Sequence, residues 1–211
     1  MKTRSIFYAA LLLLLAHYPA SATELRTLVP MLREGGYVIV FRHGATDDSQ
    51  KDVYPLNFGD MTAQRQLSEK GRETARQIGA AIKQLRIPIG EVDTSRLNRA
   101  IETGKLLSDQ EVHALDALTD SGAGSAAAMA NPTGGNAKAG LALRELVNAA
   151  PKAGTTTVIV THKTNIADAF GKDASDVQEG EAFVYKPKGS AGPAELVGRV
   201  KAADWTSQTV N

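Results

Sequence analysis

The sequence of 211 residues contains no cysteine. This absence excludes three kinds of chemistry at once, namely disulfide bonds, zinc sites with thiolate ligands and cysteine nucleophiles. The usual spacings of metal ligands are also missing from the sequence, so we expect no metal ion and no other cofactor. Any nucleophile must therefore come from another residue type.

Aromatic residues and excess charge of one sign are also scarce. Phe, Trp and Tyr make up 5% of the chain, and the formal net charge is +1. A platform for stacked bases needs aromatic side chains, and a nucleic-acid or anionic membrane surface attracts proteins with a basic field. We therefore expect no nucleic-acid partner, and any basic character must be local.

The N-terminal apolar stretch, residues 6–16, is shorter than the roughly 20 residues that a membrane-spanning helix needs. Two basic residues precede it, and the small residues at 20–22 (Ala-Ser-Ala) follow it. This order is typical of a secretory signal peptide. We expect residues 1–22 to be removed, which leaves a single domain over residues 23–211 with no stable membrane anchor. An exported protein without disulfides fits a bacterial periplasm or a bacterial secreted protein.

Two short apolar runs each stop on a histidine. Residues 38–41 (Val-Ile-Val-Phe) run into Arg42 and His43, and residues 157–161 (Thr-Val-Ile-Val-Thr) run into His162. Short β-branched runs indicate buried strands of a parallel sheet. Ligands bind outside the carboxyl ends of such strands, so we expect the two imidazoles to face one crevice.

Strand-like and helix-like segments alternate through the rest of the chain. Further strands are expected at 91–95, 112–118 and 180–187, and helices at 23–34, 68–85, 97–107, 141–149 and 165–170. This alternation predicts an α/β fold, a three-layer α/β/α sandwich with a mostly parallel central sheet.

Two segments show neither pattern. Residues 45–64 are polar and rich in turn residues, and we interpret them as a long loop over the strand ends. Residues 119–140 are rich in Ala, Gly, Ser and Asn with almost no large apolar side chains, which indicates a flexible excursion. Substrate specificity would come from these two segments.

The predicted strand ends suit an anion. A strand, a tight turn and a helix start direct backbone N–H groups and the helix dipole at a bound anion. Arg42 and Arg99 could add guanidinium groups, whose planar fork matches phosphate oxygens. A neutral imidazole beside a phosphoryl group can act as a nucleophile, and a second imidazole, if protonated, would offset charge on the transferring oxygens.

Five motifs resemble those of the histidine phosphatase superfamily, in its phosphoglycerate mutase-like branch. They are Arg42-His43-Gly44-Ala45-Thr46, Leu67-Ser68-x-x-Gly71, the arginine motif from Thr94 to Thr103, Thr161-His162 and Gly180-Glu181-Ala182. They follow the family's order over almost the whole mature chain, so the resemblance is more specific than the Arg-His-Gly tripeptide alone. The chain resembles a small exported bacterial member with a phosphoglycerate mutase-like fold.

The resemblance implies that His43 is the nucleophile that becomes phosphorylated. Thr46 would help to close the pocket loop. The rest of the phosphate pocket would consist of Arg42, Arg99 and His162.

The other candidate residues are less well specified. Arg96 and Lys163 could bind substrate or could be exposed surface charges. The general acid that protonates the leaving group would be Asp120, which stands where many small members carry a glutamate. Its rivals are Asp47, Asp48 and Asp116.

These features predict an exported, metal-independent phosphomonoesterase of the histidine acid phosphatase type. Its partner would be a small phosphorylated substrate or a phosphorylated envelope component. Two alternatives stay open: a non-catalytic module that binds phosphate or another anionic ligand in the same pocket, and, less favoured, a phosphotransferase or mutase.

Overall fold

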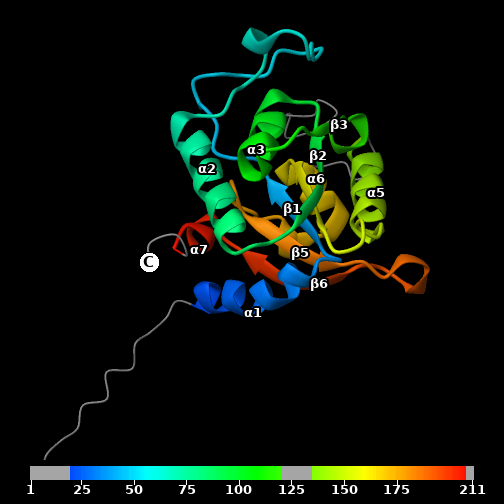
Figure 1. The fold of residues 1–211 in the computed structure, drawn as a ribbon. Helices are drawn as coiled ribbons and strands as arrows, with labels where there is room; N and C mark the ends of the chain where they lie inside the picture. The colour runs from blue at the N-terminus through cyan, green and yellow to red at the C-terminus, as the bar shows by residue number, and fades with distance from the viewer. Residues whose placement is uncertain (1–19, 120–134, 208–211) are drawn as a thin grey trace, which may run out of the picture.

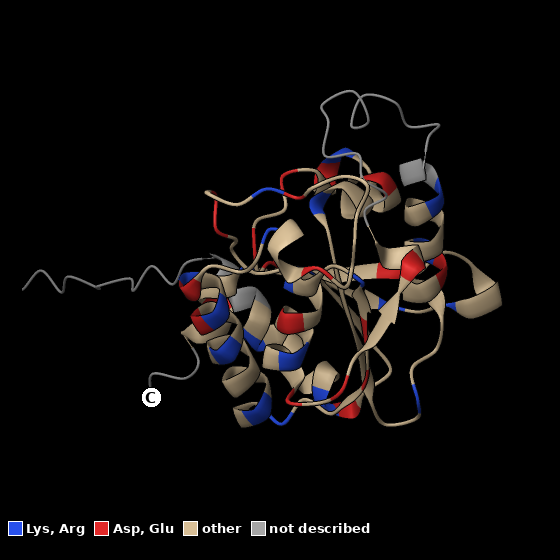
Figure 2. Ribbon diagram, turned by 90° about the horizontal axis from the view of Figure 1, so that it is seen from above, with Lys and Arg blue, Asp and Glu red and all other residues tan. Residues whose placement is uncertain are grey.

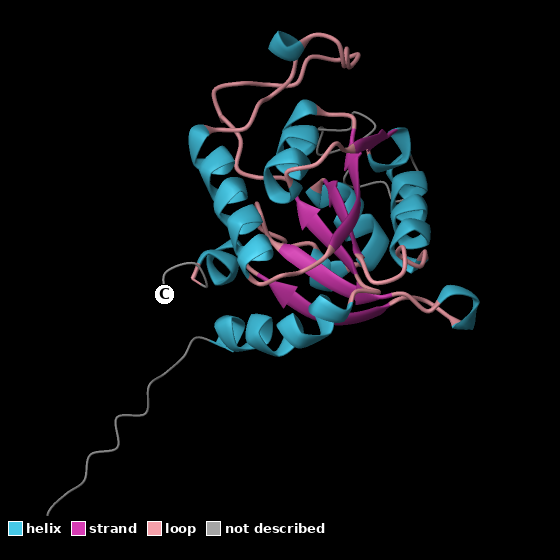
Figure 3. Cartoon of the chain, viewed as in Figure 1, coloured by secondary structure: helices cyan, strands magenta, loops and turns pink. Residues whose placement is uncertain are grey.

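The computed structural model of the protein describes residues 20–119 and 135–207. Within these ranges a six-stranded sheet has the order β3-β2-β4-β1-β5-β6 (Figures 1 and 3). The first four strands in this order are parallel, and β5 and β6 are antiparallel to their neighbours. The strands are β1 (Val38–Arg42), β2 (Ile89–Ser95), β3 (His113–Leu115), β4 (Thr156–Thr161), β5 (Ala182–Lys186) and β6 (Glu195–Val200).

Helices cover both faces of the sheet (Figure 1). One core cluster joins one sheet face to α1 (Ala20–Glu34), α2 (Glu69–Gln84), α3 (Asn98–Ser108) and α7 (Ala202–Thr206). The other cluster joins the opposite face to α5 (Gly135–Asn148) and α6 (Lys163–Phe170). The expected three-layer α/β/α sandwich with a mostly parallel sheet is confirmed.

The position of β1 explains its continuous apolar sequence. Side chains alternate between the two faces of a strand, so Ile39 and Phe41 enter the core on the α2 side. Val38 and Val40 enter the core on the α5 side. All four side chains are fully buried because β1 lies in the middle of the sheet with helices on both faces.

Two segments differ from the sequence-based expectations. The expected strand at 112–118 is limited to β3 and is followed by a 3₁₀ turn, Asp116–Leu118. The tract 119–140 was expected to be a flexible excursion throughout, but α5 already begins at Gly135 and Ala139 is buried. This part is helical because small residues allow α5 to pack closely on α6: a Cβ at Gly140 would lie 2.9 Å from the carbonyl carbon of Asp168.

The N-terminal hypothesis lies mostly outside the described ranges. Residues 1–19 are not among them, and α1 begins at Ala20, near the expected start of the mature chain. The signal peptide therefore stays a prediction. Among the described residues, none of the helices has the length and apolar character needed to cross a membrane.

The pairing of β1 with β4 brings the two motif histidines to one edge of the sheet. The strands are parallel, with Arg42 opposite Thr161 at their carboxyl ends. One step further on, the backbone N–H of His43 donates to the carbonyl of Thr161 at 3.1 Å. His162 follows directly and precedes α6.

Helix α2 packs against the loop that follows His43. Ser68 caps the helix as expected, because its Oγ accepts the N–H of Gly71 at 3.1 Å. Ser68 also donates its backbone N–H to the carbonyl of Ala45 at 2.9 Å. At Gly71 the two backbones are so close that a Cβ would overlap the carbonyl oxygen of Ala45.

This close approach gives a stability prediction. We expect Gly71→Ala to destabilise the protein by about 1–3 kcal/mol, because the methyl group would push α2 away from the loop. Gly59→Ala is the matched control, since its Cβ would meet only Asn57 Oδ1 at an ordinary 3.5 Å. Urea unfolding curves measure both effects, and equal unfolding free energies for the two variants would contradict the packing argument.

Candidate functional site

His43 and His162 form a buried pair at the carboxyl edge of the sheet. Each residue is 3% exposed. Their ring centroids lie 5.2 Å apart, and the ring planes meet at 60°. The structure therefore brings the two imidazoles together at this edge of the sheet.

The contact of His43 with its own loop assigns its tautomer. Nδ1 lies 2.8 Å from the carbonyl oxygen of Gly44, which can only accept a hydrogen bond. Nδ1 therefore carries the proton, and Nε2 keeps its lone pair. The loop is fixed in turn to α3, because the N–H of Gly44 donates to Thr103 Oγ1 at 3.1 Å.

His162 is held by a serine that the sequence analysis did not assign to the site. Its Nε2 lies 2.7 Å from Ser95 Oγ, and Ser95 is fully buried. Ser95 Oγ also accepts the N–H of Leu97 at 3.1 Å. The sequence position of Ser95 does indicate the site. Ser95 ends β2, which is parallel to β4 and β1, so the carboxyl ends of these three strands lie at the same edge of the sheet.

The two motif arginines reach the site from different elements. Arg99 in α3 is 3% exposed, and its Nη1 donates to Asp52 Oδ1 at 2.9 Å. Arg42 at the end of β1 donates from Nη1 to the carbonyl of Val177 at 2.9 Å and from Nη2 to Glu179 Oε1 at 3.3 Å. Each cation thus has a carboxylate partner on a neighbouring loop.

Burial and positive charge keep both imidazoles neutral. Burial, together with the charges of Arg99, Arg42 and Arg65, lowers the pKa of His43 to about 3. Burial also lowers the pKa of His162 well below its usual range, together with His43, Arg99 and Arg65. The sequence-based expectation allowed for a protonated His162 that offsets negative charge. A neutral His162 carries no charge and can contribute only a hydrogen bond.

Arg65 is a third cation near the pair, and it is not among the site residues expected from the sequence. Its charge lowers the pKa of both imidazoles and of Arg42. It stands at the end of the polar loop, two residues before Leu67 of the Leu-Ser motif. A polar loop carries no periodic pattern that would predict which of its charges turns inward.

The weaker binding candidates differ in their exposure. Thr46 is 8% exposed, and its backbone pairs with Leu67 in an isolated β-bridge. Lys163 opens α6 and is exposed. The guanidinium of Arg96 pairs with Asp116 Oδ1 at 2.8 Å and lies 4.1 Å from the ring centroid of Phe58.

The candidate general acids separate by their contacts. Asp116 is bound to Arg96, and its side chain is 81% exposed. Hydrogen bonds from the side chain and backbone of Ser49 lower the pKa of Asp47, which favours its ionised form and does not suit a proton donor. Asp48 is exposed. Asp120 lies outside the described residues and stays a prediction.

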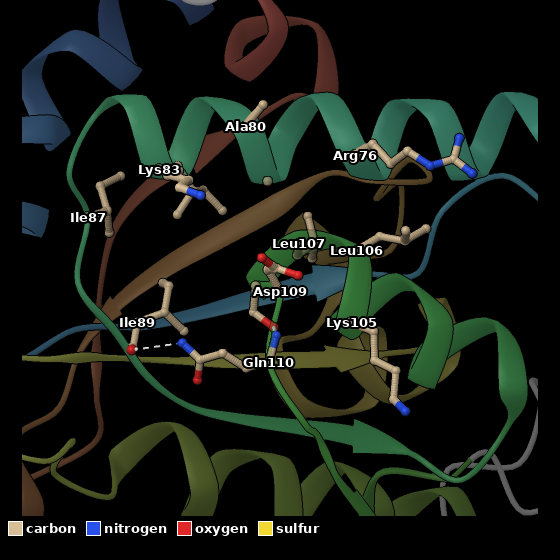
Figure 4. A pocket seen from close by; sticks show the side chains of 13 residues that line it. Arg76, Ala80, Lys83, Ile87, Ile89, Lys105, Leu106, Leu107, Asp109 and Gln110 are labelled. Atoms are coloured by element: carbon tan, nitrogen blue, oxygen red, sulfur yellow. Dashed lines mark hydrogen bonds between the residues drawn. The ribbon is translucent and has the colours of Figure 1, made fainter.

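A separate groove lies away from the histidine pair. It has a volume of about 560 Å³ and lies between the second half of α2 and the end of α3 (Figure 4). Ile89, the first residue of β2, lines it, whereas Ser95 at the other end of that strand contacts His162. The groove is therefore at the opposite end of the sheet.

Charge over the rest of the described chain is mixed. Figure 2 shows Lys and Arg interspersed with Asp and Glu around the ribbon. Within residues 20–119 and 135–207, no three His, Asp or Glu side chains are grouped closely enough to hold a metal ion.

Part of the sequence matches a known protein family. Residues 38–134 match the family model of the histidine phosphatase superfamily (branch 1). No curated protein sequence matched the chain.

Several solved structures share the fold. The protein histidine phosphatase SixA, complexed with tungstate, has a TM-score of 0.54 at 16% identity over 80% of this chain and 98% of its own. A phosphoserine phosphatase from Entamoeba histolytica, in complex with 3-phosphoglyceric acid, has a TM-score of 0.54 at 16% identity over 80% of this chain and 98% of its own. A mycobacterial glucosyl-3-phosphoglycerate phosphatase has a TM-score of 0.54 at 17% identity, over 77% of this chain and 97% of its own. These structures share the fold, and the family match identifies residues 38–134 as a histidine phosphatase superfamily (branch 1) region.

Proposed function

We propose that the protein is a metal-independent phosphomonoesterase that works through a phosphohistidine on His43. The observation that carries this proposal is a set of buried donors around the histidine pair. Arg42 Nε, Arg99 Nε and Thr46 Oγ1 are buried and have no hydrogen-bond partner within the described ranges. Leaving a buried donor unpaired costs about 1–3 kcal/mol. A phosphoryl group, with several acceptor oxygens, fits these donors.

The electrostatics of the site support the same chemistry. Arg42, Arg65 and Arg99 supply positive charge, while His43 stays neutral and offers the Nε2 lone pair. Arginine can bind phosphate oxygens and stabilise the charge that they carry in the transition state. The carbonyl of Gly44 accepts a hydrogen bond from Nδ1–H and so stabilises the positive ring that forms on attack.

The proposed reaction has two steps. In the first, Nε2 of His43 attacks phosphorus, the bond from phosphorus to the ester oxygen breaks, and an acid protonates the leaving alkoxide. We propose Asp120 for that acid, as the sequence position suggests. In the second step the ionised acid takes a proton from a water, the water oxygen attacks the phosphohistidine and the P–N bond breaks. Phosphate leaves with His43 neutral and the acid protonated again.

The proposed reaction indicates the chemical class of the substrate, a phosphate monoester. Structural neighbours are described with phosphoserine and with 3-phosphoglyceric acid, which are small phosphate monoesters. We propose a small phosphorylated molecule or a phosphorylated envelope component as substrate. The N-terminal sequence supports export to the periplasm or beyond, as part of the same proposal.

The first test concerns the nucleophile. We expect His43→Ala to lower kcat for an aryl phosphate by about 10³-fold or more, because removing a covalent nucleophile removes the first step. Wild-type turnover should persist in EDTA. The matched control is His113→Ala, since the His113 side chain is 64% exposed and pairs with Asp93. Equal turnover of wild type and His43→Ala would reject the mechanism, and tight vanadate binding without turnover would instead indicate a binding module.

The second test concerns the two neutral imidazoles. A histidine in the unfolded chain titrates near pH 6.5, whereas burial lowers the pKa of folded His43 to about 3. Between these values the unfolded chain binds more protons, so the unfolding free energy falls as the pH falls. The loss is at most about 1.4 kcal/mol per pH unit for each such histidine.

Urea titrations at pH 7 and pH 4.5, in buffers without phosphate, measure this loss. We expect the double variant His43→Gln/His162→Gln to lose less stability between the two pH values than wild type does. His113→Gln should keep the wild-type loss. The account is wrong if the double variant shows the same pH dependence as wild type.

A further inference from the structure

The loop between β1 and α2 contributes a carboxylate, Asp52, to the arginine cluster. Its Oδ1 accepts hydrogen bonds from Arg99 Nη1 and from the backbone N–H of Arg65, both at 2.9 Å. The Asp52 side chain is 12% exposed and that of Arg99 is 4% exposed. One carboxylate oxygen thus connects the guanidinium of Arg99 to the backbone of Arg65, and the charges of both residues lower the pKa of His43.

This contact determines how the Arg99 guanidinium is turned. Nη1 is directed at Asp52, while Nε is buried without a partner in the described part of the chain. A guanidinium is planar and rigid, so fixing one nitrogen fixes the direction of the others. Without Asp52, the buried Nη1 would lose its charged acceptor, which favours rotation of the side chain to another partner.

The loop that carries Asp52 is itself anchored on α3. Gln64 is 1% exposed, and its Nε2 donates to the carbonyl oxygens of Asn57 at 3.3 Å and Phe58 at 3.2 Å. Its Oε1 accepts the N–H of Asn98, the first residue of α3, at 3.0 Å. The loop is therefore bound to α3 at Asn98, the residue before Arg99. The rest of the loop extends above α2 and α3 (Figure 1).

We propose that Asp52 is a positioning residue for the phosphate pocket. It holds Arg99 so that the Nε edge meets an oxyanion, and it fixes the backbone of Arg65 beside the same site. The inference rests on the proposed function for the kind of ligand, a phosphate ester or a phosphate-like oxyanion. Asp52 acts through Arg99 and does not touch the reacting atoms.

A double-mutant cycle tests this inference with vanadate as the probe. Its members are wild type, Asp52→Ala, Arg99→Ala and the double variant, with affinity measured by calorimetry. We expect Asp52→Ala to weaken vanadate binding about tenfold or more, because it removes a hydrogen bond to a charged group. In the Arg99→Ala background the same change should cause no further loss.

The control is a second carboxylate on the same loop. Asp60 accepts hydrogen bonds from Thr62 and Ala63 and caps the short 3₁₀ helix Met61–Ala63. Asp60→Ala should change vanadate affinity by less than about twofold, because that carboxylate holds only its own turn. A loss as large as that of Asp52→Ala would show a general loop effect and overturn the inference.

Two further results would overturn it. One is a vanadate affinity of Asp52→Ala within twofold of wild type. The other is that Asp52→Ala weakens vanadate binding as much in the Arg99→Ala background as it does in wild type. Asp52→Asn keeps an acceptor oxygen without the charge and should give a smaller loss, and it replaces Asp52→Ala in the cycle if that variant does not fold. Wild type that binds vanadate but hydrolyses no ester refutes the proposed function alone, whereas wild type that binds no vanadate refutes both.

Discussion

The parallel pairing of β1 with β4 is the constraint on which the rest of the site depends. It sets Arg42 opposite Thr161, so that His43 and His162 leave the sheet at the same edge. A shift of one residue in this register would exchange the two faces of a strand and move the apolar side chains out of their cores. The register is fixed by burial on both faces of β1, which means that the core and the site are specified by the same side chains.

The second constraint is the concentration of cations at that edge. Arg42 and Arg99 are buried or half-buried, and each has a carboxylate partner, Glu179 and Asp52 respectively. Isolated buried charges are costly, so these carboxylates stabilise the arginines while their Nε groups stay free of partners among the described residues. The cations in turn favour the neutral form of His43, which is the form that can attack phosphorus.

The strands, the helices after them and the two histidines could be predicted because burial leaves periodic apolar patterns in the sequence. Asp52 and Arg65 could not be identified in this way, since they meet the site only through tertiary contacts of a polar loop. Ser95 has no periodic signal either, and only its place at the end of β2 indicates the site. The start of α5 was missed because its first turns lack large apolar residues and are placed by packing against α6. The roles of Asp120 and of the N-terminal segment stay predictions.

The central claim is that a phosphoryl group is transferred to His43. Rapid-quench mixing of the protein with an aryl phosphate, followed by alkaline work-up and peptide mass spectrometry, tests it most directly. The account predicts a phosphate group on His43 that forms and decays during turnover and that is absent from His162. Turnover without any phosphorylated residue, or with phosphate on a different side chain, would contradict it.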